Sequence, residues 1–411
     1  MNRAECQAMD QQDSLSGLRE KFLLDEGLIY LDGNSLGPMP LAVAARVAET
    51  TQAQWGRDLV TSWNRHNWID LPVRVGEKIA HLVGAAPGQV ICTDSTSVNL
   101  FKVLSAALSL RPERRVILST RDNFPTDLYM AEGLAALLGK QRCELRLVDS
   151  GKVHESLDRN LAVLMLTEVN FRTGARFDMA ALTAAAHAVG ALVIWDLAHS
   201  AGALPVQLDE ANADFAVGCS YKYLNGGPGA PGFLYVAARH LESVTQPLSG
   251  WMGHASPFDF SPGYSPGAGI RRFATGTPAV ISMSALDTAL TVFDGVDMAQ
   301  VRNKSVKLAE VFISCVEAAP DLAGLELLSP RDPTARGSQV SFSHPGAYAM
   351  IQALIERGII GDFREPDILR FGLCPLFLRF VDVFDAVNTL AEIVRQGSWQ
   401  AARFQQRQPV T

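Results

Sequence analysis

"LAVLMLTEVNFRTGARFDMAALTAAAHAVGALVIWDL", residues 161–197, contains two continuous apolar runs on either side of an alanine-rich segment. The runs at 161–167 and 191–197 are typical of parallel strands that are covered on both faces. The segment between them has a helical composition, with Asp178 as a helix N-cap and Gly190 as a C-terminal stop. Strand, helix and strand in this order predict an α/β sheet with right-handed crossovers.

The neighbouring residues extend this pattern. Another apolar run at 115–119, with alternating β-branched and alanine-rich stretches, predicts a large α/β domain with a mainly parallel sheet over residues 40–280. Beyond residue 280, long helical segments lead into short strands at 338–344 and 368–373, with the helix-like segment 347–358 between them. This change predicts a small α+β domain formed by residues 1–39 and 281–411.

The composition is that of an ordinary globular protein, with 48% hydrophobic and 19% charged residues among 411. A net charge of −7 argues against nucleic acid or an anionic membrane as a partner. We find neither an apolar run long enough to span a membrane nor a signal-peptide core, so a cytoplasmic enzyme is expected. The six cysteines show no C-x-x-C pairing, and no metal-ligand cluster appears, so neither disulfides nor a metal are expected.

The stretch "CSYKYLNGGPGAPGFLYV", residues 219–236, contains a G-x-G-x-x-G pattern at Gly227, Gly229 and Gly232. A dinucleotide-binding turn needs a helix directly after such glycines. Here two prolines interrupt the loop, and the strand-like "GFLYVAA" follows it. The match is therefore interpreted as accidental.

Lys222 in the same stretch is a candidate for covalent catalysis. It follows the apolar segment "DFAVGCS" and is flanked by two tyrosines. Burial disfavours the charged ammonium form, which suits a lysine that forms a Schiff base. The alternative is a half-exposed lysine at the end of a strand.

Two further polar residues lie at the end of the predicted strand 191–197, where Asp196 is 26 positions before Lys222. Asp196 and His199, in "VIWDLAHSAG", lie where α/β folds place ligand-binding groups. A carboxylate there can keep a pyridine nitrogen protonated, so that pyridoxal 5′-phosphate (PLP) acts as an electron sink. Separately, Asp196 is as well explained as a turn cap and His199 as a polar contact. Together with Lys222 they form the arrangement that PLP chemistry requires.

A phosphate site is predicted where "QVICTDSTSVNLF" (89–101) passes from a short strand into an apolar helical run. Four polar or small residues at 94–97 precede the helix, whose N-terminus favours anions. Helix capping alone explains only one or two of them. Phe124 in "NFPTD" is placed to stack on a flat cofactor ring, and its alternative is a core phenylalanine in a turn.

These motifs together resemble the kynureninase family, PLP enzymes of the aspartate aminotransferase-like fold (fold type I) close to the class V aminotransferases. The resemblance runs through nearly the whole chain. It rests on "YLDGNSLGPMP" (30–40), "STSVNL" (95–100), "FPTD" (124–127), "WDLAHSAG" (195–202), "CSYKYLNGGPG" (219–229), "GWMGH" (250–254) and "RFGLCPLF" (370–377).

The resemblance implies a role for each matching residue. Lys222, Asp196 and Tyr221 would be catalytic, and Arg370 would bind the substrate α-carboxylate in a bidentate fork. The alternative for Arg370 is a strand-edge charge with an acidic neighbour such as Asp367. The implied PLP contacts are Thr96, Ser97, Phe124, Pro125, Thr126, Asp127, Thr167, Asp196, His199, Tyr221, Lys222, Trp251 and Thr277. The last two would come from the second subunit of a homodimer with shared active sites.

The implied reaction is hydrolytic Cβ–Cγ cleavage of L-kynurenine, or of its 3-hydroxy form, to anthranilate and L-alanine. It would belong to tryptophan catabolism and the kynurenine pathway towards NAD. Alternatives are a cysteine desulfurase-like lyase with Cys374 as nucleophile, a class V aminotransferase, and a non-catalytic PLP-binding protein.

Overall fold

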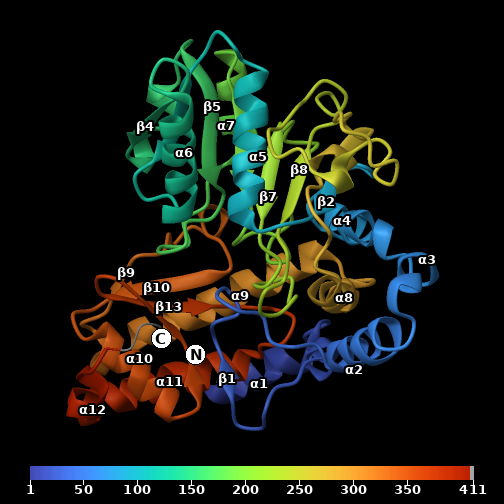
Figure 1. Cartoon of the computed structure of the whole chain (residues 1–411). Coiled ribbons are helices and arrows are strands. Elements are labelled where there is room, and N and C mark those ends of the chain that lie inside the picture. Colours follow the sequence, from blue (N-terminus) through green and yellow to red (C-terminus); the bar gives the residue numbers. More distant parts are fainter. Residues whose placement is uncertain (408–411) are drawn as a thin grey trace.

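A seven-stranded sheet forms the centre of the larger part of the molecule (Figure 1), in a computed structural model that describes residues 1–407. From edge to edge its strands are β2 (Val90–Cys92), β8 (Phe233–Val236), β7 (Phe215–Gly218), β6 (Leu192–Asp196), β5 (Leu161–Thr167), β3 (Val116–Thr120) and β4 (Glu144–Val148). Strand β8 is antiparallel to both neighbours, and the other pairs are parallel. The α/β prediction is therefore confirmed.

Helices cover both faces of this sheet. In Figure 1, α5 (Thr96–Ser109) and α6 (Pro125–Leu138) lie on one face, and α7 (Met179–Ala188) lies on the other. On β5, Val163 and Met165 belong to the core cluster on the α5 side, and Leu164 and Leu166 belong to the cluster on the α7 side. A strand that is buried on both faces needs apolar side chains at every position, which explains the continuous run at 161–167.

The helix between β5 and β6 begins and ends where its local signals predict. Asp178 is the N-cap, and its side chain accepts a hydrogen bond from the backbone N–H of Ala181. Gly190, two residues after the helix, has a φ of +81°, a conformation that glycine adopts without strain.

The C-terminal part contains a four-stranded antiparallel sheet, at the lower left of Figure 1. Its strands, in spatial order, are β12 (Asp362–Arg364), β13 (Ile368–Gly372), β10 (Gln339–Ser343) and β9 (Glu326–Leu327). The accompanying helices are α8 (Val280–Ala289), α9 (Met298–Ala318), α10 (Ala347–Glu356), α11 (Phe380–Gln396) and α12 (Ala402–Gln405).

The N-terminal segment packs against this C-terminal part. Strand β1 (Ile29–Tyr30) pairs in parallel with β11 (Ile359–Ile360), and Asp10 in α1 (Arg3–Gln11) accepts hydrogen bonds from the first two backbone N–H groups of α11. Further along lie α2 (Leu41–Glu49), α3 (Ser62–Arg65) and α4 (Leu71–Leu82), of which α4 packs against β2. The domain boundaries stay a prediction, and residues 408–411 of the predicted small domain lie outside the described residues.

Candidate active site

The predicted catalytic residues meet at the carboxyl ends of the parallel strands. Thr167 ends β5 and Asp196 ends β6, and these two residues are register partners. Lys222 follows β7 by four residues and is buried. Its Nζ lies 2.9 Å from Nε2 of His199. Residues 23 or more positions apart in the sequence, such as His199 and Lys222, are thus brought together at one edge of the sheet.

Asp196 and Asp127 form a buried carboxyl pair beside Lys222. Burial, and then the charge of Asp196, raise the pKa of Asp127 well above its ordinary value. Burial also raises the pKa of Asp196, but Lys222 and the backbone N–H of Ala198, which donates to Asp196 at 2.8 Å, oppose that rise. Asp127 is therefore the protonated member of the pair, and Asp196 carries the negative charge.

His199 is a neutral imidazole with one unused nitrogen. Burial, and then the charges of Lys222 and Arg370, lower its pKa well below the ordinary value. Its Nδ1 is buried and makes no hydrogen bond within the described chain. A buried polar atom without a partner is costly, so this nitrogen is available to a ligand beside Lys222.

Two aromatic rings flank the lysine. The Phe124 ring centroid lies 5.7 Å from Lys222 Nζ, and that of Tyr221 lies 5.8 Å away. Burial raises the pKa of Tyr221, so its hydroxyl stays protonated and able to donate. Phe124 packs edge-to-face on Phe171 at 5.2 Å and leaves its own ring partly exposed.

The predicted phosphate site lies at the start of α5. Ser95 is the N-cap and accepts from the backbone N–H of Val98, so Thr96 and Ser97 are the first residues of the helix. The glycine loop packs directly on this turn, because a Cβ on Gly232 would lie 2.8 Å from the Thr96 nitrogen. Gly232 is followed by strand β8 and by no helix, which confirms that the glycine pattern is not a dinucleotide turn.

Arg370 is fully buried in β13. It donates to the carbonyl of Phe171 at 2.8 Å and to Oγ of Ser35 at 2.7 Å, and it forms an ion pair with Asp362. The alternative of a strand-edge charge is wrong, because β13 lies between β12 and β10 in the sheet. Arg370 does have an acidic neighbour, but it is Asp362, whereas Asp367 accepts a hydrogen bond from Ser343.

Of the remaining predicted contacts, Pro125, Thr126 and Thr167 adjoin this cluster, and Trp251 and Thr277 lie at the surface. Pro125 and Thr126 begin α6, and the hydroxyl oxygen of Thr167 lies 3.3 Å from the carboxyl group of Asp127. Trp251 is 38% exposed and packs on Phe258, with ring centroids 5.7 Å apart. Thr277 is also exposed, so these last two side chains point to solvent in the single chain.

Several residues of the cluster had no role in the sequence-based prediction. Asp32 and Ser35 lie in the "LDGNSLG" motif, which contributed to the resemblance without an assigned function, so a signal was present for them. Asn123 precedes the "FPTD" motif, and its side-chain oxygen accepts a hydrogen bond from Thr167. No motif or pattern in the sequence indicates a role for Phe171 or Asp362.

These residues fit PLP. The cluster offers an amine to bind the aldehyde, an ionised carboxylate for the pyridine nitrogen and an aromatic face for the ring. It also offers a helix N-terminus for the phosphate and the unused His199 nitrogen.

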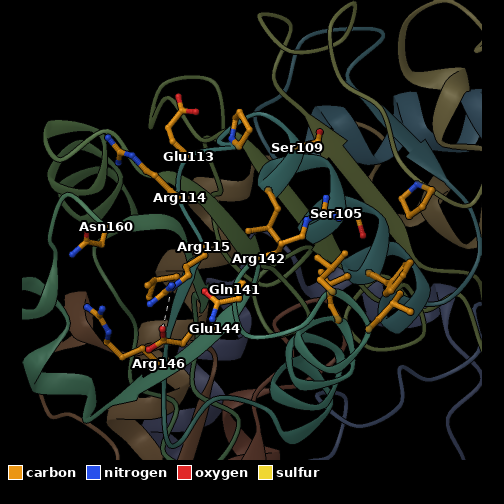
Figure 2. Close-up of a pocket in the computed structure, with 18 of the residues that line it drawn as sticks. Ser105, Ser109, Glu113, Arg114, Arg115, Gln141, Arg142, Glu144, Arg146 and Asn160 are labelled. Atoms are coloured by element: carbon orange, nitrogen blue, oxygen red, sulfur yellow. Dashed lines mark ion pairs between the residues drawn. The ribbon is translucent and has the colours of Figure 1, made fainter.

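A separate cavity of about 1060 Å³ lies at the other end of the sheet, around α5, β3 and β4 (Figure 2). It contains none of the predicted site residues. Two of its arginines are already paired, Arg115 with Glu144 at 3.4 Å and Arg146 with Asp158 at 2.6 Å. Nothing there points to catalysis.

Solved structures define the class of the fold. A cysteine desulfurase from Thermococcus onnurineus matches with a TM-score of 0.78 and 19% identity, over 92% of this chain and 98% of its own. The cysteine desulfurase CsdA from Escherichia coli matches with a TM-score of 0.76 and 21% identity, over 94% and 98%. The chain thus has the fold of the fold type I PLP-dependent enzymes, which confirms the predicted fold class.

Sequence relatives define the family. The Pseudomonas fluorescens kynureninase is 52% identical over 100% of this chain and 99% of its own length. A Burkholderia pseudomallei kynureninase is 51% identical with the same coverage. Residues 301–390 also match the family model of the kynureninase C-terminal domain. The chain belongs to the kynureninase family.

Proposed function

We propose that this protein is a PLP-dependent hydrolase that cleaves L-kynurenine to anthranilate and L-alanine. The main support for the proposal is the buried cluster of Lys222, His199 and Asp196. This cluster occurs in a chain that is about half identical to kynureninases over its full length. PLP bound to Lys222 would supply an electron sink for the bonds to the substrate α-carbon and, later in the reaction, for the Cβ–Cγ bond.

The chain's own groups would bind the substrate and move protons. Lys222, once free of the cofactor, would remove the α-proton as a general base. Asp196 would hold a proton on the pyridine nitrogen, because its buried carboxylate carries a negative charge. Tyr221, which keeps its hydroxyl proton, would donate to the oxygen that gains charge when water adds to the γ-carbonyl. Arg370 would hold the α-carboxylate at the small-domain side of the site.

We further propose a homodimer. An apolar groove of about 960 Å³ is lined by exposed hydrophobic side chains that include Met39, Trp55 and Ile281. It also includes Gly37, whose N–H donates to the carbonyl of Tyr221 at 2.8 Å. A second copy on this groove would therefore lie next to the active site and bring its own Trp251 and Thr277 there.

The desulfurase alternative has structural relatives but lacks a reactive nucleophile. Cys374 is buried, and burial raises the pKa of its thiol to about 12. Such a thiol forms almost no thiolate at neutral pH.

Among residues 1–407, no helix is long and apolar enough to cross a membrane. The cytoplasmic location and the place in tryptophan catabolism and NAD synthesis stay predictions.

The direct test adds L-kynurenine to PLP-loaded protein and follows anthranilate fluorescence and alanine formation. Equal amounts of both products are expected. Stoichiometric release of ammonia or conversion of the cofactor to its amine form, without anthranilate, would contradict the proposal and favour another PLP reaction.

A further inference from the structure

Three charged side chains, Asp32, Asp362 and Arg364, form a cluster around the end of Arg370. Arg370 and Arg364 contribute positive charges from β13 and β12, and Asp362 contributes a negative charge from the start of β12. Asp32 enters from the "LDGNSLG" segment, more than 300 residues away in the sequence. Asp362 and Arg370 are register partners across the two strands, which brings their side chains together.

The contacts within this cluster are close. Arg364 Nε lies 2.8 Å from Asp362, which also forms an ion pair with Arg370. Asp32 lies 3.9 Å from Arg370. Asn34 connects Asp32 and Arg370 when its amide nitrogen faces Asp32. The amide nitrogen then donates to Asp32 at 3.1 Å, and the amide oxygen accepts from Arg370 Nε at 3.3 Å.

The charges of the cluster balance without any ligand. Two guanidinium groups face two carboxylates, and the side chains of Asp32, Asp362 and Arg370 are 14% exposed or less. A substrate carboxylate held by Arg370 adds one negative charge to this buried site. Unpaired buried charge is costly, so the site gains by neutralising one carboxylate when the substrate binds.

We propose that Asp32 is a positioning residue that takes up a proton when an amino-acid carboxylate binds to Arg370. In the free enzyme its negative charge helps to hold the guanidinium, and in the complex the substrate carboxylate replaces it. The inference rests on the proposed function, because it requires Arg370 to bind the substrate carboxylate.

Asp32 is the member of the cluster best suited to accept the proton. Burial, and then the neighbouring charge of Asp362, raise its pKa to about 7, against the opposing effect of Arg370 and Arg364. The other titratable groups that face it are phenols, Tyr30 and Tyr223, whose pKa values burial raises, so both are neutral. Above pH 7 the free enzyme therefore holds Asp32 ionised, and ligand binding must bring a proton with it.

The test measures the dissociation constant of L-alanine for PLP-loaded protein between pH 7.5 and 9, from the change in cofactor absorbance. By linkage, the slope of log Kd against pH counts the protons taken up, so the wild-type slope should exceed that of Asp32→Asn by about one. Protons exchanged by the ligand amine and the cofactor are common to both proteins and cancel in this difference. Equal slopes would overturn the proposal.

Asp362→Asn provides an independent variant if Asp32→Asn does not fold. In the complex of this variant, two guanidinium groups face two carboxylates, those of Asp32 and the ligand. These charges balance without an added proton, so the slope of log Kd against pH should also fall below the wild-type slope. Asp25→Asn removes an exposed carboxylate of the same N-terminal segment and should keep the wild-type slope. An Asp362→Asn slope equal to that of the wild type would contradict the charge balance.

Failure of this inference is distinguishable from failure of the proposed function. A protein that forms anthranilate but shows equal slopes would overturn only the role of Asp32. A protein that shows the slope difference with L-alanine but forms no anthranilate from L-kynurenine would overturn only the proposed reaction.

Discussion

At the scale of single residues, the site holds neighbouring buried groups in different charge states. Asp127 is neutral, Asp196 is negative and His199 is neutral, although all three are buried close to Lys222. The difference arises from their neighbours, since Asp196 gains from the lysine charge and a backbone N–H, whereas Asp127 faces Asp196. Such a set of separated pKa values is typical of catalytic sites.

Replacing Asp196 tests the importance of its charge. Asp196→Asn keeps the size of the side chain, and Asp196→Ala removes the side chain, but both lose the buried charge that would hold the pyridine nitrogen protonated. Each should lower kcat by about a hundredfold or more, equivalent to roughly 3 kcal/mol of transition-state stabilisation. Steady-state kinetics with saturating PLP measures this effect. Near wild-type kcat in the Asn variant would contradict the role of the charge.

Replacing Arg370 tests substrate recognition. Arg370→Lys keeps a positive charge but loses the planar fork that holds a carboxylate through two hydrogen bonds. The KM for L-kynurenine should rise about 10- to 100-fold, equivalent to roughly 1.4–2.8 kcal/mol of binding energy, with a smaller effect on kcat. An unchanged KM would show that another group holds the carboxylate.

At the scale of elements, most of the large sheet could be predicted from local signals. The 161–197 unit is readable because β5 and β6 are apolar on both faces, and because Asp178 and Gly190 mark the ends of the helix. The pairing of Asp362 with Arg370 could not be predicted, because it depends on the register of two strands. The contact of Phe171 with Arg370 depends on how a turn of the large sheet meets the small one, which no local pattern encodes.

Asp214 shows how the elements of the large sheet are joined. Its buried carboxylate lies 2.7 Å from Nε2 of His187 on α7 and accepts from the backbone N–H of Val193 on β6 at 2.9 Å. Arg239 and His240, after β8, lie 2.6 and 2.8 Å from the same carboxylate. One side chain, directly before β7, thus connects α7, β6 and the segment that follows β8.

We expect Asp214→Asn to lower the free energy of unfolding at pH 7 by about 2–4 kcal/mol, because it leaves buried partners of the carboxylate without their charge. Burial alone would raise the pKa of Asp214, but hydrogen bonds from His187, His240 and Arg239 lower it below its ordinary value. A carboxylate with a lowered pKa stabilises the fold above its unfolded-state pKa of about 4, and this stabilisation is lost as the pH falls further.

Urea denaturation of both proteins at several pH values measures this contribution. The difference between wild type and Asp214→Asn should be largest near pH 7 and should shrink below about pH 4. A difference that stays constant down to pH 3 would show that the effect is one of packing and not of charge.

At the scale of the whole molecule, the exposed hydrophobic groove supports the proposed homodimer. Trp251 is exposed, as are Phe258 and Phe260 beside it, and the groove contains a further set of exposed apolar side chains. Monomeric proteins seldom expose apolar surfaces of this kind. A twofold dimer would cover the groove and bring two active sites to one interface.

Ile281→Glu tests this interface, because it places a charge in the groove on a side chain that is 39% exposed in the single chain. Sedimentation velocity should show a shift from a dimer towards a 44.4 kDa monomer, together with a loss of kynurenine cleavage. Leu137→Glu is the matched control, since Leu137 on α6 is 71% exposed and lies outside the groove. A fully active Ile281→Glu monomer would contradict the shared site.

Above all, we propose that Lys222 is the residue that binds PLP covalently at this edge of the sheet. Borohydride reduction of the PLP-loaded protein, followed by digestion and peptide mass spectrometry, locates the attached phosphopyridoxyl group directly. We expect the group on Lys222, with one group per chain. Attachment to any other lysine, or none at all in a protein that converts L-kynurenine, would contradict it.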